Sequence, residues 1–314
     1  MYERISEVDI ERPFKKETDS ATKILFLGDI MLGRAVENLQ NEHGNDYPFS
    51  KVGEFLKKYD VVVANLEGPI MAHHVQTPLF STRFSFVSST PKLLKKYNIG
   101  IVSLANNHTS DYGLSGLEDT RKSLMAEGII GVGGSGEDEY SLQKIMINNT
   151  SVAILALNSV FHTPDRQKIK NIISTVEKEM TVIVLVHWGD EYIPLSNRRE
   201  RELAHFLIDE GADLIIGHHP HVVQEVERYN GKIIFYSLGN FIFDQYFSKE
   251  TQEGIAVEFV IDNEDVSYKI YPFESNKSMP ELLVDDRQEW IEEFSKRIRT
   301  IERGELIGKI QTQK

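Results

Sequence analysis

The chain has 314 residues, of which 40% are apolar, and a formal net charge of −13 from 48 acidic and 35 basic residues. This length and apolar content suffice for one large α/β domain or two small ones, with a sizeable core. The charge argues against a protein that binds nucleic acid or an anionic membrane, which would carry a basic stripe. The sequence contains no cysteine, which excludes disulfides, thiolate metal sites and cysteine nucleophiles.

The first residues of the chain are polar and charged. Residues 1–21 lack the apolar core of a signal peptide and are expected to form an N-terminal arm. No apolar run approaches the roughly 18 residues that a membrane span needs. We therefore expect a soluble chain without a transmembrane segment, with the cytoplasm as its first-choice location.

Short apolar runs rich in β-branched residues alternate with amphipathic segments along most of the chain. The runs, each expected to be a strand, are 23–29, 60–68, 99–108, 181–190, 213–221 and 232–240, and a hairpin is expected over 144–158. Helices are expected over 114–128 and 197–211, each ended by a glycine. This alternation predicts a layered α/β fold with parallel pairing, in one domain.

The pattern changes near the C-terminus. From about 233 to 273 strand follows strand, so an antiparallel portion is expected there. Beyond it, an apolar stripe over 290–301 has the spacing of a helix that packs on the body of the protein.

Polar residues with metal-ligand chemistry directly follow the apolar runs. They are Asp29, Asn65, Glu67, Asn107, His108, His187, His218, His219, His221 and Asn240. In open α/β sheets, ligands bind outside the carboxyl ends of the strands. Carboxylate, amide and imidazole groups together suit a divalent ion such as Zn, Mn or Fe. The sequence therefore predicts one shared metal site at these strand ends, with room for two ions about 3.5–4 Å apart.

Each of these residues also has a structural interpretation when taken alone. Asp29 could cap the next helix, Glu67 could sit in a turn, and His187 could be a satisfied histidine beside the core. The H-x-H spacing of His219 and His221 puts both rings on the same side of an extended chain, although a solvated loop could carry it too. Their joint occurrence at successive strand ends favours the shared site.

Six ordered segments resemble the signature segments of a known family. They are GDIMLGR, NLEGPI, ANNHTSDYG, VHWGDEY, GADLIIGHHPH and IFYSLGNFIFD, and they resemble the CapA family of poly-γ-glutamate capsule synthesis proteins. That family is similar to the calcineurin-like metallophosphoesterases. The resemblance covers about residues 22–245 and implies an α/β sandwich of mixed β-sheets flanked by helices. It could extend to about residue 275 but does not cover the two ends of the chain. Together with the residue patterns, it leads us to expect an arm (1–21), a CapA-like domain (22–275) and a C-terminal helical extension that packs on the domain (276–314).

The resemblance also implies a ligand set. The implied metal ligands are Asp29, Glu67, Asn107, His187, His219 and His221, with Glu67 as the bridging acid and His218 as an alternative to the last pair. Met31 stands where the superfamily has a histidine ligand, so either one ion or two unequal ones remain open.

Catalytic roles follow from the same resemblance. His108 matches the catalytic acid, and because Thr109 replaces the acidic residue that usually follows it, Asp111 is a candidate for orienting the ring. Arg34 either clamps a substrate oxyanion or forms an ion pair on a helix surface. Trp188, Glu191 and Tyr192 are expected to line the crevice.

Two functions of different classes remain open at this stage. The first is metal-dependent hydrolysis of a phosphoester or of poly-γ-glutamate, with one or two ions of Mn, Zn or Fe and with His108 as proton donor. The second is a non-catalytic factor that binds a polyanionic γ-glutamyl polymer through its metal. Other capsule synthesis proteins are expected as partners, nucleic acid is not, and the resemblance leaves a membrane-associated or extracellular role open.

Overall fold

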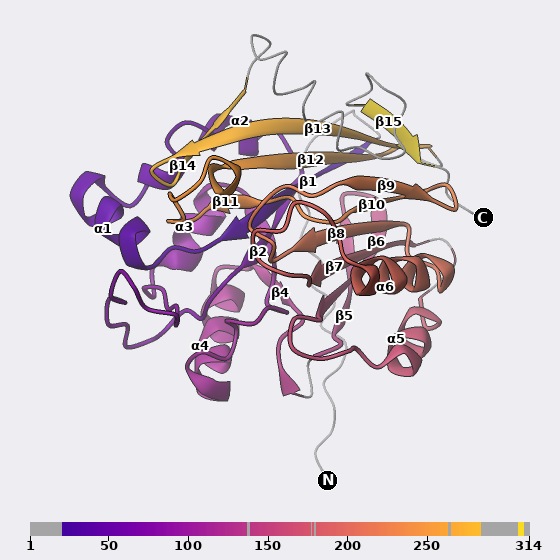
Figure 1. Ribbon diagram of the computed structural model, residues 1–314, viewed down its shortest axis with the longest axis horizontal. Coiled ribbons are helices and arrows are strands. Elements are labelled where there is room, and N and C mark those ends of the chain that lie inside the picture. Colours follow the sequence, from indigo (N-terminus) through magenta and orange to yellow (C-terminus); the bar gives the residue numbers. More distant parts are fainter. Residues whose placement is uncertain are drawn as a thin grey trace.

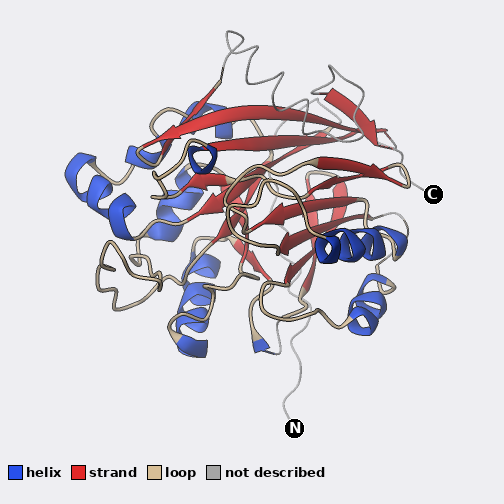
Figure 2. Ribbon diagram, in the orientation of Figure 1, coloured by secondary structure: helices blue, strands red, loops and turns tan. Residues whose placement is uncertain are grey.

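Two mixed β-sheets pack face to face, and helices cover their outer faces (Figures 1 and 2). This computed structural model describes residues 21–136, 139–176, 178, 180–262, 265–283 and 307–310. The layered α/β sandwich of mixed sheets flanked by helices that the sequence predicts is therefore confirmed. The predicted N-terminal arm lies outside the described residues except for Ala21.

The larger sheet contains nine described strands. They are β1 (Thr22–Ile30), β2 (Val61–Leu66), β3 (Ile99–Ser103), β4 (Ile130–Val132), β11 (Asn240–Ile242), β12 (Glu253–Asp262), β13 (Asp265–Asn276), β14 (Met279–Leu282) and β15 (Ile307–Ile310). The strand order is β14-β13-β12-β1-β2-β3-β4, with β11 also paired to β1 and β15 to β13. Strands β1 to β4 are parallel, whereas β12 to β15 pair antiparallel. In this sheet the antiparallel portion expected from about residue 233 begins only at β12, because β11 pairs parallel with β1.

The smaller sheet contains six described strands. They are β5 (Leu142–Ile147), β6 (Thr150–Asn158), β7 (Thr181–His187), β8 (Leu214–His218), β9 (Val226–Tyr229) and β10 (Lys232–Phe235). Their order is β5-β6-β7-β8-β10-β9, parallel from β6 to β10 and antiparallel at both edges. The predicted hairpin over 144–158 is the pair β5–β6.

Helices and 3₁₀ turns lie outside the two sheets. They are α1 (Arg34–His43), η1 (Tyr47–Phe49), α2 (Gly53–Leu56), α3 (Thr90–Lys96), α4 (Gly113–Ala126), α5 (Arg166–Ile173), α6 (Arg198–Asp209) and η3 (Glu250–Gln252). Figure 1 shows α1, α3 and α4 on one side of the molecule and α5 and α6 on the other. Among the described residues, no helix is long and apolar enough to span a membrane.

Strand β1 shows why the apolar runs are continuous. Successive side chains of a strand point to opposite faces. Ile24 and Phe26 enter the core between the sheets, while Leu25 and Leu27 enter the core beneath α1 to α4. Both faces of the sheet are covered, so both sets of side chains are apolar, and each buried one stabilises the fold by about 1.5–3 kcal/mol.

Strand register brings the polar residues that follow the runs to one edge of the sandwich. In the larger sheet, Asp29 on β1 pairs with Asn65 on β2 and with Asn240 on β11. In the smaller sheet, His187 on β7 pairs with His218 on β8. Gly28 permits the approach of β11, since a Cβ there would lie 1.9 Å from the carbonyl oxygen of Gly239.

One described helix differs from what the sequence predicts, and one expected helix is not described. The apolar residues of the helix predicted over 114–128 are Leu114, Leu117, Leu124 and Met125. Leu117 and Leu124 are buried in α4, but Leu114 and Met125 are 63% and 66% exposed, so only half of these residues pack on the sheet. The helix expected over 290–301 lies outside the described residues. The described parts of 276–314 beyond the end of β13 include β14 and β15, which both pair with β13.

Candidate metal centre

Two buried carboxylates from neighbouring strands of the larger sheet form the base of the centre. Asp29 ends the apolar run of β1, Glu67 follows β2, and both are fully buried. The side-chain amide of Asn65 lies between them and donates to Asp29 Oδ1 at 2.8 Å and to Glu67 Oε2 at 3.2 Å. This bond geometry fixes the two carboxylates relative to each other, with one oxygen of each left for other partners.

The three clustered histidines of the sequence divide into two kinds. His218, the last residue of β8, directs Nε2 at the carbonyl oxygen of Leu27, 3.2 Å away, and so packs against β1. The ring of His221 instead lies beside both carboxylates, and the backbone N–H of His219 is directed at Asp29. His219 and His221 have positive φ angles, 97° and 58°, a conformation that costs of order 1–3 kcal/mol for a non-glycine residue and that clusters at functional sites.

His221 reaches both acids. Its Nδ1 lies 3.4 Å from Asp29 Oδ2 and its Nε2 lies 3.6 Å from Glu67 Oε1. Nδ1 is also 2.9 Å from Asn240 Oδ1. The amide nitrogen of Asn240 donates to Gln245 and to the carbonyl of Thr251, so its oxygen must accept from His221. Nδ1 therefore carries a proton, and Nε2 is the nitrogen suited to a metal.

His187 and Asn107 complete the ring of candidate ligands from the other sheet and from the loop after β3. His187 Nε2 lies 2.8 Å from Asn107 Oδ1 and donates a hydrogen bond to it, because an amide oxygen can only accept. The rings of His187 and His219 are 4.8 Å apart between centroids. All six predicted ligand residues thus lie in one cluster, and His218 lies at its edge with a structural contact.

Burial and neighbouring charges shift the pKa values of the ionisable side chains in the cluster. Burial, reinforced by the charge of Asp29, raises the pKa of Glu67 well above its ordinary value, against the opposing effect of His221. Burial likewise lowers the pKa of His187, and it lowers that of His219 to about 4. The pKa of His221 is raised to about 9, because the attraction of Glu67 and Asp29 outweighs its burial.

Two buried atoms in the cluster have no hydrogen-bond partner, Glu67 Oε1 and His219 Nδ1. A buried carboxylate oxygen without a hydrogen bond is costly, and a cation removes that cost. Ligand atoms of Asp29, Glu67 and His221 lie within 4.8 Å of one another. Carboxylate oxygen and imidazole nitrogen in this arrangement fit a divalent metal ion.

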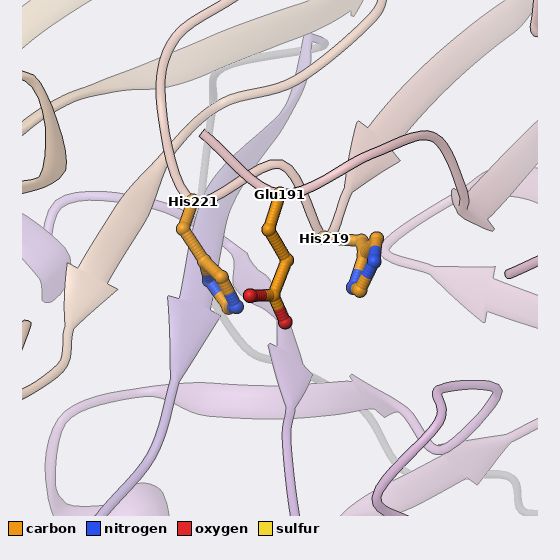
Figure 3. A group of neighbouring side chains, drawn as sticks. All are labelled: Glu191, His219 and His221. Atoms are coloured by element: carbon orange, nitrogen blue, oxygen red, sulfur yellow. The ribbon is translucent and has the colours of Figure 1, made fainter. Parts of the chain in front are cut away.

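A second group of possible ligands adds an acid outside the ligand set expected from the sequence. Glu191, His219 and His221 also offer ligand atoms within 4.8 Å of one another (Figure 3). From the sequence, Glu191 is expected only on the crevice wall. The available signal was its position in HWGDEY, four residues after His187 in a loop that leaves a strand end.

His108 stands at the rim, beside the acids. Its Nδ1 lies 2.9 Å from Asp111 Oδ2, and its Nε2 lies 3.9 Å from Glu67 Oε1. Its ring packs against Phe84 at 4.0 Å between centroids. The buried Thr109 hydroxyl is engaged with Leu104 and Asn106, so Asp111 occupies the orienting position that Thr109 does not.

Arg34 lies near the centre but is already engaged. Its guanidinium pairs with Asp244 through two side-chain contacts and donates to the carbonyl of Ser81 at 3.0 Å. It also stacks over Phe84, 4.6 Å from the ring centroid. Met31, by contrast, is fully buried in the core beneath α1 to α4, and its sulfur accepts from the backbone N–H of Gly33.

The sandwich of two mixed sheets and the carboxylate–imidazole cluster at its strand ends define a layered α/β protein with a candidate divalent-metal centre. Residues 23–245 match the family described as Bacterial capsule synthesis protein PGA_cap, and the chain belongs to that family.

Two relatives and one solved structure illustrate the likeness. The chain is 32% identical over 295 residues to the PGA biosynthesis protein CapA of Bacillus subtilis (strain 168), covering 85% of this chain and 75% of that protein. It is 31% identical over 293 residues to the capsule biosynthesis protein CapA of Bacillus anthracis, covering 85% and 71%. A hypothetical protein from Thermus thermophilus has a similar fold, with a TM-score of 0.53 and 17% identity over 80% of this chain and 99% of that one.

Proposed function

We propose that this protein takes part in poly-γ-glutamate capsule synthesis and that its metal centre hydrolyses a phosphoester or a γ-glutamyl bond. The observation that carries the catalytic part is the buried, unpartnered oxygen of Glu67, which faces imidazoles from a separate strand end. The names of the two Bacillus relatives support the capsule context.

Asp29, Glu67, Asn107, His187, His219 and His221 would hold one or two divalent ions of Mn, Zn or Fe. When bound, such an ion supplies Lewis-acid polarisation of a substrate oxygen and a lower pKa for water. Glu67 Oε1 lies 3.6 Å from His221 Nε2 and 3.9 Å from His108 Nε2, so Glu67 would hold an ion close to the proposed proton donor.

His108 would donate a proton to the leaving group. Asp111 accepts from Nδ1, so the opposite nitrogen, Nε2, is directed toward the acids and is free to face a substrate atom. Phe84, stacked on the ring, restricts its rotation.

The test is turnover of an aryl phosphodiester and of a γ-glutamyl oligomer by purified protein, before and after chelation and after return of Mn²⁺ or Zn²⁺. We expect activity that chelation abolishes and metal restores. His108→Ala should lower turnover by roughly 10²–10⁴-fold at unchanged metal content. The loss should be smaller on a nitrophenyl ester, whose leaving group needs no proton, and His162→Ala, at an exposed histidine outside the cluster, is the control.

The ion pair between Arg34 and Asp244 favours a second function. Because Asp244 already pairs with its guanidinium, Arg34 is not free to clamp a substrate oxyanion unless that pair opens. A centre without this clamp suits a non-catalytic factor that binds carboxylates of a γ-glutamyl polymer through its metal. Metal-dependent retention of the polymer without turnover of either substrate would identify this second function.

A further inference from the structure

The carboxylate of Glu191 lies at the solvent side of the candidate centre, opposite the buried acids. Figure 3 shows it between the imidazoles of His219 and His221, with all three side chains directed into the same space. Glu191 is exposed, whereas both histidines are buried. The two imidazoles therefore form the buried side of this group, and the carboxylate of Glu191 forms its solvent-exposed side.

His219 has a ring nitrogen without a hydrogen-bond partner. Nδ1 of His219 is buried and has no hydrogen-bond partner, and the side chain is only 4% exposed. Its backbone N–H is already directed at Asp29, which fixes the residue in its positive-φ conformation. One imidazole nitrogen of His219 lies within 4.8 Å of a carboxylate oxygen of Glu191 and of a nitrogen of His221, and these atoms form a set of three possible ligands.

The loop that carries Glu191 is fixed to the segment that carries the histidines. The backbone N–H of Tyr192 donates to the carbonyl of Pro220 at 2.8 Å. At its other end the loop is held by buried Glu225, whose carboxylate accepts from the backbone N–H of Ser196 at 2.9 Å and from its hydroxyl at 2.7 Å.

Between these two anchors, Gln224 donates to the carbonyl of Ile193 at 2.9 Å. The two segments behave as one preformed unit, so Glu191 reaches the histidines without rearrangement of the backbone.

We infer that Glu191 is a metal ligand that binds a divalent ion together with His219 and His221, at the solvent-facing side of the centre. The inference rests on the proposed metal centre and goes beyond it by assigning a ligand that the strand-end pattern does not contain. Because Glu191 is exposed, the ion it holds faces the space from which a substrate approaches. The buried Asp29 and Glu67 lie on the inner side of the same centre.

The test is a titration of metal-free protein with Mn²⁺, with free Mn²⁺ followed by electron paramagnetic resonance. Glu191→Gln keeps the size of the side chain and removes its charge. Loss of a partner one shell further out already costs about 10–100-fold in metal affinity, so loss of this ligand should weaken at least one Mn²⁺ by about tenfold or more. Asp190→Asn is the matched control, since it removes the same charge from the neighbouring exposed residue.

A second readout separates binding from folding. The metal-free Glu191→Gln protein should unfold at the same temperature as the metal-free wild type, because the side chain is exposed. Saturating Mn²⁺ should raise that temperature less in the variant than in the wild type or in Asp190→Asn.

Three results are decisive. Weaker Mn²⁺ binding in Glu191→Gln alone supports the inference. Equal binding in Glu191→Gln and wild type, with binding lost in Asp29→Asn, overturns the inference and leaves the proposed centre standing. If the wild type binds neither Mn²⁺ nor Zn²⁺, both the inference and the metal-dependent part of the proposed function fail.

Discussion

The Nδ1 atom of His108 lies 2.9 Å from Oδ2 of Asp111, and that same oxygen accepts from the backbone N–H of Phe84 at 2.7 Å. Asp111 is thus held by the backbone of Phe84, whose ring also packs against the ring of His108. A histidine whose one nitrogen is held by a carboxylate presents the other in a defined direction, as proton transfer requires.

If His108 donates a proton, Asp111→Ala should lower turnover by about tenfold or more through loss of ring orientation, without changing metal content. The same change in a His108→Ala background should have almost no further effect, because the two residues act through one proton. A double-mutant cycle on the aryl phosphodiester measures this. Additive losses would show that Asp111 acts elsewhere, for example by holding the segment around Phe84.

The adjacent histidines His218 and His219 should respond differently to removal. His218→Ala leaves the carbonyl of Leu27 without its partner and should destabilise the metal-free fold by about 1–3 kcal/mol, with little effect on Mn²⁺ affinity. His219→Ala removes a side chain whose Nδ1 has no partner, so it should weaken Mn²⁺ binding more than folding. Denaturant unfolding and Mn²⁺ titration of both variants check this, and the reverse pattern would exchange their roles.

Metal binding should release protons. In the metal-free protein the attraction of Glu67 and Asp29 outweighs burial and raises the pKa of His221 to about 9, so at neutral pH the ring holds a proton on Nε2 that a bound ion must displace. Affinity for Mn²⁺ should therefore rise with pH between about 7 and 9. Calorimetry at pH 7 in buffers of different ionisation enthalpy reports the number of protons released, and a value of zero would contradict this.

Glu200 gives the fold a pH dependence outside the centre. Burial raises its pKa to about 7, although its carboxylate accepts from the backbone N–H of Asn197 at 2.7 Å in the cap of α6. The pKa of Glu200 is higher in the folded than in the unfolded state. Its contribution to the free energy of unfolding is therefore full below about pH 4.5 and is lost as the pH rises toward 7.

Glu200→Gln should remove that loss, so the variant should gain stability relative to wild type between pH 5 and pH 8. Thermal unfolding at both values measures it. Glu202→Gln, an exposed position on the same helix, should show no such change. Parallel behaviour of Glu200→Gln and wild type across this range would refute the assignment.

The sequence predicted the strands from the spacing of apolar residues, and it predicted the shared site from the polar residues that follow them. Apolar runs such as that of β1 predicted the strands, and the register of Asp29 with Asn65 explains why residues distant in sequence meet. It could not separate His218 from its neighbours, since that depends on a single contact across the sandwich, to Leu27.

The contacts that loops make also could not be predicted from the sequence. Glu191 reaches the centre because its loop is fixed to Pro220 and Glu225, and Arg34 meets Asp244 from 210 positions away. The exposed Leu114 and Met125 of α4 show the same limit, because helical spacing alone does not say how wide a face the sheet covers. The assignment of catalytic and ligand roles stays a prediction.

The central claim is that the carboxylates of Asp29 and Glu67 and the imidazoles of His219 and His221 bind a divalent ion. Anomalous diffraction from a crystal grown with Mn²⁺, recorded near the manganese edge, tests it most directly. The account predicts an anomalous peak at coordination distance from a Glu67 oxygen and from a nitrogen of His221. A fully loaded crystal with no peak in this cluster, or with its strongest peak on residues outside it, would contradict the account.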